Sequence, residues 1–143
     1  MKAQVLYKAG EAFVLEDRPD PVPGPGEAVA KVLACGAGLT IHHIRAGRGT
    51  ANFPIIIGHE ITGEIVEVGK SGADGGLKVG DPVTAYFYLI EGEDKWTRAG
   101  RAPISTVNQG YIGRQIDGGY AEYIKLPVAN YIKLPEGLDY KNK

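Results

Sequence analysis

An imidazole and a carboxylate stand next to each other in this chain, at His59 and Glu60. The apolar run 55–57 leads into Gly58, and the alternating segment 61–68 follows the pair, so both side chains fall at the mouth of a predicted strand. Loops at strand ends carry a large share of binding and catalytic groups. Because both side-chain types bind metals and transfer protons, the segment predicts a metal or substrate site at His59 and Glu60.

A second candidate pair is Thr40 and His43, which are three residues apart in segment 39–46. This segment is predicted to be a short helix, on which residues at that spacing share a face. A proton can then pass from the hydroxyl to the imidazole, whose ordinary pKa of about 6.5 suits shuttling near neutrality. The alternative is that Thr40 caps the helix while His42 and His43 are solvated.

Composition bounds the class of protein. The chain has 143 residues, 43% of them hydrophobic, and a formal net charge of -1, which suits one domain with one core. No basic patch points to nucleic acid, and no apolar run approaches the about 20 residues of a membrane span. The N-terminus lacks the apolar core of a signal peptide. The single cysteine, Cys35, excludes an internal disulfide, so we expect a cytoplasmic protein.

The elements that must position these residues are mostly strands. Glycines and prolines, 21 and 9 of them, punctuate short alternating runs, a pattern typical of all-β proteins. We expect strands at 3–7, 13–18, 27–35, 55–57, 61–68, 81–87, 118–126 and 130–134. We expect a glycine-rich turn at 70–80, an irregular polar segment at 89–109 and a polar tail at 139–143. The sequence therefore predicts a mainly β fold, a partly open antiparallel β-barrel with one or two short helices and a polar lobe.

Several short motifs occur in an order that resembles one family. Ala34-Cys35-Gly36 precedes Thr40 and His43, and Gly58-His59-Glu60 follows. Further along come the segments 80–83 (Gly-Asp-Pro-Val), 117–123 (Asp-Gly-Gly-Tyr-Ala-Glu-Tyr) and 134–138 (Leu-Pro-Glu-Gly-Leu). Together they resemble the N-terminal GroES-like domain of the medium-chain dehydrogenase/reductase superfamily, the zinc-type alcohol dehydrogenases.

The resemblance implies an NAD- or NADP-dependent oxidoreductase that acts on alcohol, carbonyl or enone substrates. It implies that residues 1–143 are the GroES-like portion with a lobe at 88–110, and that the Rossmann cofactor domain is absent from this chain. Gly36-Ala-Gly38 lacks the third glycine of a dinucleotide fingerprint. We expect a fragment that is inactive alone, whose partners are the small substrate, the missing cofactor domain and possible further copies of itself. The alternative is a standalone GroES-like binding module.

The resemblance also places two zinc sites, and this chain departs from both. At the catalytic site the cysteine position holds Gly38 and the following aspartate position holds Ile41, while His59 and Glu60 remain. Cys35 could replace the lost ligand, which leaves open a zinc site of Cys35, His59 and Glu60. The other interpretations are a direct substrate role for His59 and Glu60, or a structural role in a polar cleft.

At the structural site the four cysteine positions hold Glu91, Asp94, Thr97 and Ser105. None is a thiolate, so the resemblance implies a metal-free lobe. We expect Glu91 and Asp94 to form ion pairs with the nearby basic residues Lys95, Arg98 and Arg101. By the same resemblance Thr40 and His43 relay a proton from the alcohol. Arg45 and Arg48 either bind a cofactor phosphate or substrate carboxylate, or are exposed charges.

Overall fold

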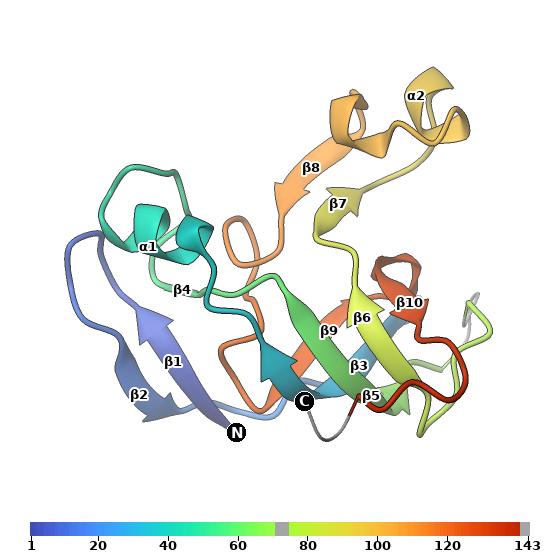
Figure 1. Ribbon diagram of the computed structural model, residues 1–143, viewed down its shortest axis with the longest axis horizontal. Helices are drawn as coiled ribbons and strands as arrows, with labels where there is room; N and C mark the ends of the chain where they lie inside the picture. The colour runs from blue at the N-terminus through green and yellow to red at the C-terminus, as the bar shows by residue number, and fades with distance from the viewer. Residues whose placement is uncertain (71–74, 141–143) are drawn as a thin grey trace.

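The computed structural model describes residues 1–70 and 75–140. Parts of two predicted segments, the turn at 70–80 and the tail at 139–143, therefore lie outside the described residues. The chain forms three antiparallel sheets, two of which build a body from which the third projects (Figure 1). No helix among the described residues is long and apolar enough to cross a membrane. The mainly β, partly open barrel expected from the sequence is confirmed.

The largest sheet has five strands, in the order β10 (Tyr131–Lys133), β6 (Pro82–Ala85), β5 (Ile61–Val68), β3 (Glu27–Cys35) and β9 (Tyr123–Pro127). The short 3-10 turn η2 (Val128–Asn130) joins β9 to β10. Two register shifts interrupt the β3–β5 pairing, and such bulges increase the twist that lets a sheet curl on itself. The concave side buries the main core: Ala28, Ala30, Ile61, Ile65, Leu77, Val83, Ile112, Ile124, Leu126 and Tyr131.

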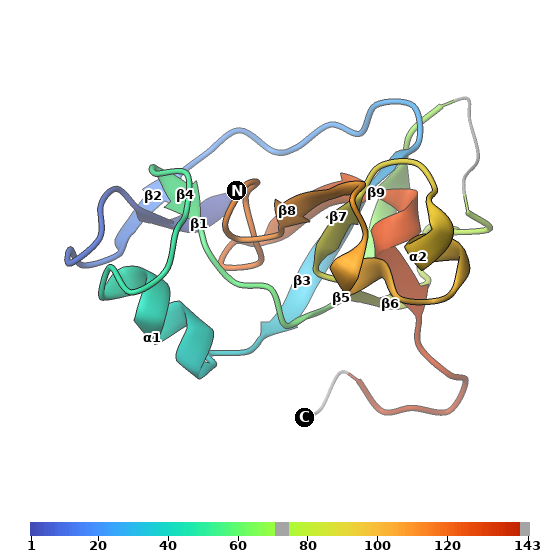
Figure 2. The same ribbon diagram turned by 90° about the horizontal axis from the view of Figure 1, so that it is seen from above.

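The second sheet is formed by β2 (Val14–Asp17), β1 (Lys2–Leu6) and β4 (Ile55–Ile56). The helix α1 (Leu39–Arg45) lies beside it, as Figures 1 and 2 show. Two apolar residues of the helix, Ile41 and Ile44, pack in one cluster with Leu6 and Ile55. Their spacing of three places both on one face. This packing fixes the helix against the sheet that leads into Gly58 and His59.

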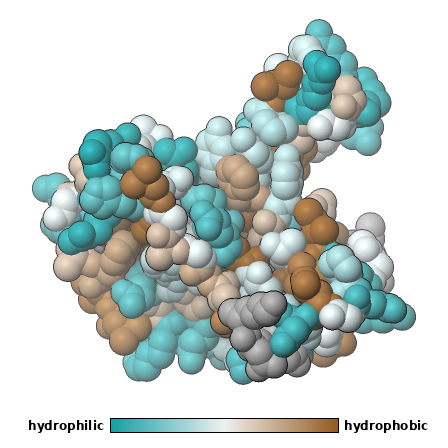
Figure 3. All heavy atoms as spheres, viewed as in Figure 1, coloured by the Kyte–Doolittle hydropathy of each residue, from teal (hydrophilic) through white to brown (hydrophobic). Residues whose placement is uncertain are grey.

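The third sheet carries the lobe, residues 88–110, which rises away from the body (Figure 1). It consists of β7 (Tyr88–Ile90), α2 (Lys95–Arg98), the 3-10 turn η1 (Ala102–Ile104) and β8 (Asn108–Tyr111). Its surface is mostly hydrophilic in Figure 3. The predicted irregular structure at 89–109 is wrong, because these elements are three or four residues long and too short to show a hydrophobic period.

The remaining strands match the predictions with one exception. The expected strand 118–126 begins only at Tyr123. Before it, Gly118 and Gly119 donate backbone hydrogen bonds to the carbonyls of Ile56 and Gly58, at 2.6 and 2.9 Å. The segment thus follows the chain that leads to His59 instead of extending β9.

A buried hydroxyl ties the two ends of the five-stranded sheet together. Tyr131 belongs to the edge strand β10, and its hydroxyl donates to the carbonyl of Ile124 in the opposite edge strand at 2.9 Å. The carbonyl of Ala28 in β3 lies 3.3 Å from the same oxygen. Burial raises the pKa of this phenol, so it stays a neutral donor. The sheet is therefore drawn into a barrel by a side chain across its interior.

The closure predicts the effect of Tyr131→Phe. The substitution keeps the ring but removes the one hydroxyl proton, which the Ile124 carbonyl accepts, so we expect a loss of about 1 kcal/mol in the free energy of unfolding. Urea unfolding of this chain measures it. Tyr7→Phe is the matched control, because the Tyr7 hydroxyl bonds Glu16 on the exposed surface. Equal effects of the two substitutions would contradict a role for Tyr131 in closure.

Candidate functional site

The pairing of β3 with β5 brings the predicted site residues together. Cys35 is opposite Ile61 at the end of the pair, and the Gly36 amide donates to the Glu60 carbonyl at 2.8 Å. The chain that leaves β3 toward α1 therefore runs next to the chain that enters β5 from His59. Thr40 and His59, which are distant in sequence, reach one cavity as a result.

This cavity has a volume of about 230 Å³. It is lined by residues from four separate segments: Thr40, His59, Phe87, Tyr111, Ile112 and Arg114. The His59 ring lies 5.3 Å from the Phe87 ring, measured between centroids. The lining thus combines a hydroxyl, an imidazole and a guanidinium with aromatic walls, which is the composition of a site for a small polar molecule.

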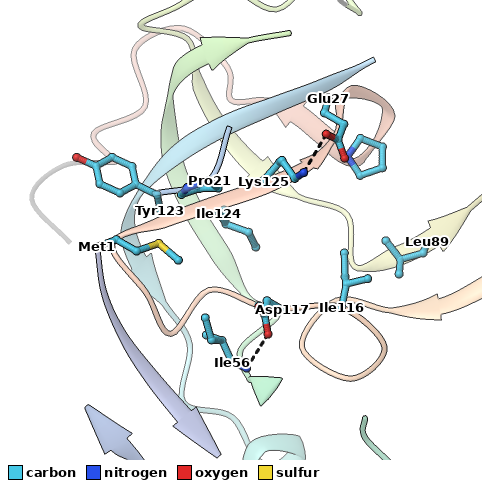
Figure 4. A pocket seen from close by; sticks show the side chains of 12 residues that line it. Met1, Pro21, Glu27, Ile56, Leu89, Ile116, Asp117, Tyr123, Ile124 and Lys125 are labelled. Carbon is cyan, nitrogen blue, oxygen red and sulfur yellow. Dashed lines mark hydrogen bonds and ion pairs between the residues drawn. The ribbon is translucent and has the colours of Figure 1, made fainter. Parts of the chain in front are cut away.

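A larger cavity, of about 470 Å³, lies elsewhere, among the N-terminus, β3, β9 and the segment around Asp117 (Figure 4). Its charged side chains are already engaged with the protein. Lys125 pairs with Glu27 at 3.1 Å, and the Asp117 carboxylate accepts from the Ile56 amide at 2.9 Å. None of the predicted site residues lines it. A further cavity, of about 540 Å³, has Cys35 as its one predicted site residue, whereas Thr40 and His59 both line the cavity of about 230 Å³. The cavity of Thr40 and His59 is therefore the candidate site.

Glu60 lies over the two glycines that begin the connection to α1. A Cβ at Gly38 would stand 2.6 Å from its Oε1, and a Cβ at Gly36 would stand too close to its Oε2. The exposed carboxylate thus fills the space that a side chain at position 38 would need. Its neighbour His59, in contrast, faces the cavity.

Cys35 lies in a packed, largely apolar environment. Its Sγ would be 2.7 Å from a Cβ at Gly58 and 3.0 Å from one at Gly119, so the half-buried sulfur lies against the backbone of both glycines. Burial raises its pKa to about 11, so without a metal the sulfur is a thiol at neutral pH. Residues 1–70 and 75–140 contain no group of three or more His, Cys, Asp and Glu side chains that could hold a metal ion.

His43 shares the helix with Thr40 but does not line the cavity. Its Nδ1 is buried and has no hydrogen-bond partner among the described residues. The helix begins after Gly38 without any side-chain cap, so the alternative that Thr40 caps it is wrong. The Thr40 side chain is therefore available to a ligand. No described residue bonds the Nδ1 of His43, so this nitrogen is free to take part in a proton relay from Thr40.

Four lining residues were not predicted from the sequence: Arg114, Phe87, Tyr111 and Ile112. Arg114 is the charged one. It is the sole charged residue between Arg101 and Asp117, a signal that was available in the sequence. Its guanidinium lies 5.3 Å from the centre of the Tyr111 ring, and its charge contributes to the lowered pKa of His59. The candidates Arg45 and Arg48 are both exposed, and Arg45 bonds the Glu11 carbonyl at 2.9 Å.

The loops that carry His59 and Arg114 touch backbone to backbone. Gly58 precedes His59 and Gly113 precedes Arg114, and both glycines have positive φ angles, of 102° and 73°. A Cβ at Gly113 would stand 2.9 Å from the amide nitrogen and the carbonyl oxygen of Gly58. A Cβ at Gly118 would approach the same carbonyl to 2.1 Å. Only glycine permits this contact, which sets the spacing of the two side chains.

Residues 24–136 match the family described as the alcohol dehydrogenase GroES-like domain. The chain belongs to this family. Among curated relatives, L-threonine 3-dehydrogenase of Streptomyces avermitilis is 41% identical over 136 residues, covering 91% of this chain. A solved structure, the cobalt- and zinc-bound thermostable alcohol dehydrogenase from Pyrobaculum aerophilum, is 32% identical over 96% of this chain, with a TM-score of 0.88. The resemblance to the GroES-like domain of the medium-chain dehydrogenases is thereby confirmed.

A further solved structure, acetophenone reductase from Geotrichum candidum in complex with NAD, is 30% identical over 96% of this chain, with a TM-score of 0.84. This chain spans 38% of the length of the Streptomyces relative, 40% of the Geotrichum chain and 42% of the Pyrobaculum chain. It is similar to the N-terminal part of zinc-type dehydrogenases, which are the oxidoreductases of this family.

At the lobe positions where the GroES-like family resemblance places cysteines, this chain has a hydrogen-bond network. Asp94 Oδ1 accepts from the amides of Trp96 and Thr97, at 2.9 and 2.8 Å. Asp94 Oδ2 accepts from the amide and hydroxyl of Thr106, both at 3.0 Å. The Thr97 hydroxyl accepts in return from the Asp94 amide at 2.8 Å, which completes a capping box on α2. One carboxylate thus joins both strands of the lobe through α2 and Thr106.

The expected ion pairs of Glu91 and Asp94 are wrong within the described part of the chain. The basic residues Lys95 and Arg101 form none there, and Arg98 pairs only with Glu93, at 3.8 Å. Asp94 is unavailable because backbone and hydroxyl donors surround it. Desolvation raises the pKa of its carboxyl, but the hydrogen bonds from Thr97, Thr106 and Ser105 outweigh this and leave the pKa well below its ordinary value.

Asp94→Asn should open the lobe without unfolding the barrel. We expect faster hydrogen exchange at the amides of Trp96, Thr97 and Thr106, with unchanged exchange in β3 and β5. In the wild type the same loosening is expected in acid. The folded pKa lies below the unfolded value of 3.8, so the stabilisation is present above pH 3.8 and is lost as pH falls below it. Glu93→Gln is the control, and equal exchange in both variants would exclude the network.

The electrostatics of the cavity predict the titration of His59. Burial lowers its pKa, the Glu60 charge partly opposes this, and the Arg114 charge lowers it further. A proton NMR titration should place the pKa of His59 below 6.5 and move it upward in Arg114→Gln. Arg101→Gln, on the exposed lobe, should leave it unchanged. A His59 pKa that does not respond to Arg114→Gln would show that the two groups do not share the cavity.

Proposed function

We propose that this chain is the N-terminal catalytic-domain portion of an NAD- or NADP-dependent dehydrogenase that acts on small alcohols and carbonyl compounds. The observation that carries the proposal is the cavity in which Thr40 and His59 converge, in a member of the alcohol dehydrogenase GroES-like family. A Rossmann domain is proposed to bind the cofactor and to form the other wall. The chain by itself is then inactive.

In this proposal the nicotinamide, when bound, supplies the hydride chemistry. The residues of this chain bind and orient the substrate. The Thr40 hydroxyl contacts the substrate oxygen, and His43 passes the proton toward solvent. His59, whose pKa is lowered by burial and by Arg114, is neutral near pH 7 and donates a hydrogen bond to the same oxygen.

We further propose that the reaction does not depend on zinc held by this chain. Gly38 offers no donor, Glu60 fills the space above it, and the half-buried Cys35 sulfur packs against Gly58 and Gly119. The alternative, zinc bound by Cys35, His59 and Glu60, requires the Cys35 thiol to lose its proton and leave its packing. The metal-free lobe held by Asp94 belongs to the same proposal, as does a cytoplasmic location.

The test is the complete enzyme, assayed with NAD and with NADP on a panel of small alcohols. The panel includes L-threonine, because the Streptomyces relative is an L-threonine 3-dehydrogenase. We expect Thr40→Val to lower kcat about 100-fold or more, because it removes the hydroxyl that starts proton transfer. Thr50→Val, on an exposed loop, is the matched control.

Activity should also survive exhaustive chelation, with elemental analysis to count zinc in the same sample. Stoichiometric zinc that is lost in Cys35→Ala would revive the alternative ligand set. The absence of any nicotinamide-dependent turnover in the complete protein would refute the proposed function and favour a binding module.

A further inference from the structure

Arg114 carries a positive charge that the described residues do not neutralise. No carboxylate in residues 1–70 or 75–140 lies within ion-pair distance of its guanidinium, and its buried Nε has no hydrogen-bond partner there. The side chain contacts the face of Tyr111 and is half-buried. Buried donors of this kind are usually satisfied, because an unpaired one costs the desolvation of the group.

The guanidinium is held in the wall of the small cavity. Arg114 lines it together with Thr40 and His59, and its Nη2 lies 3.0 Å from where a Cβ at Gly49 would stand. The backbone contact between Gly58 and Gly113 fixes Arg114 relative to His59. A guanidinium held in a cavity wall faces a bound ligand, whereas that of an exposed surface arginine such as Arg48 faces solvent.

We propose that Arg114 binds a carboxylate of the substrate, so that the enzyme acts on hydroxy acids and their oxo counterparts; this rests on the proposed dehydrogenase function. The planar guanidinium matches a carboxylate with two parallel hydrogen bonds. One guanidinium balances one carboxylate, and among the described residues no lysine or second arginine lines the cavity to balance a doubly charged phosphate.

Thr40, His59 and Arg114 line one small cavity of about 230 Å³, to which the proposed cofactor domain adds the other wall. The closeness of the three side chains, and not the volume, limits how far the carboxylate stands from the reacting carbon. The substrate hydroxyl that contacts Thr40 and the substrate carboxylate that contacts Arg114 then belong to one short molecule. In that molecule the hydroxyl is two or three carbons from the carboxylate. The aromatic walls of Phe87 and Tyr111 leave room for a small apolar chain.

The test compares a matched pair of substrates on the complete enzyme, 3-hydroxybutyrate and 1,3-butanediol, which differ in the carboxylate. We expect wild type to favour the acid, and Arg114→Gln to raise KM for the acid about 10- to 100-fold while KM for the diol changes much less. Arg114→Lys keeps the positive charge but cannot donate two parallel hydrogen bonds, so it should retain only part of the preference for the acid over the diol. Arg101→Gln should change nothing. Equal losses on acid and diol, in both Arg114 variants, would overturn the proposal.

Saturation-transfer NMR on this chain separates the carboxylate proposal from the proposed function. We expect 3-hydroxybutyrate to bind the wild type and not Arg114→Gln, whether or not the complete protein transfers hydride. If the complete protein has no dehydrogenase activity but this Arg114-dependent binding is seen, the carboxylate site stands and the proposed function fails. Binding of inorganic phosphate, followed by 31P NMR, in place of 3-hydroxybutyrate, or no binding of either, would overturn the carboxylate site.

Discussion

The site depends on one pairing, that of β3 with β5. Because Cys35 is opposite Ile61, the residues that follow β3 and those that precede β5 must run beside each other. A shift of one residue would turn every side chain of β5 to the opposite face, and would move His59 away from Thr40. The register is held by the buried residues of β3 and β5, among them Ala30 and Ile65. The hydrophobic core of the barrel therefore determines the geometry of the polar cavity.

A carboxylate lies at each of the two places where the resemblance to the GroES-like family implies a metal site. Glu60 lies above Gly38, and Asp94 gathers four hydrogen bonds at the centre of the lobe. The two carboxylates differ in their hydrogen-bond donors, since amides and hydroxyls surround Asp94. This difference explains why Asp94 organises its surroundings, whereas Glu60 mainly occupies space and contributes charge near His59.

Much of the fold could be predicted from the sequence, because alternation over 27–35 and 61–68 reports a sheet with one buried face. The helix at Leu39–Arg45 followed from its flanking glycines. The lobe could not be predicted from periodicity, since its order comes from local hydrogen bonds to Asp94. Two of the six residues that line the candidate cavity, Thr40 and His59, could be predicted from motifs. Arg114 could not, because it lies in a loop without a period and reaches the cavity only through the contact between Gly113 and Gly58.

That glycine contact also bears on how such a site can change over evolutionary time. Gly58, Gly113 and Gly118 join the two loops through main-chain atoms alone, so the distance between the loops does not depend on the side chains they display. Residues at positions 59 and 114 can then be exchanged one at a time on an unaltered frame. A lineage built on this frame can pass from one substrate to another through folded intermediates, whereas a larger residue at one of the glycines would close the route.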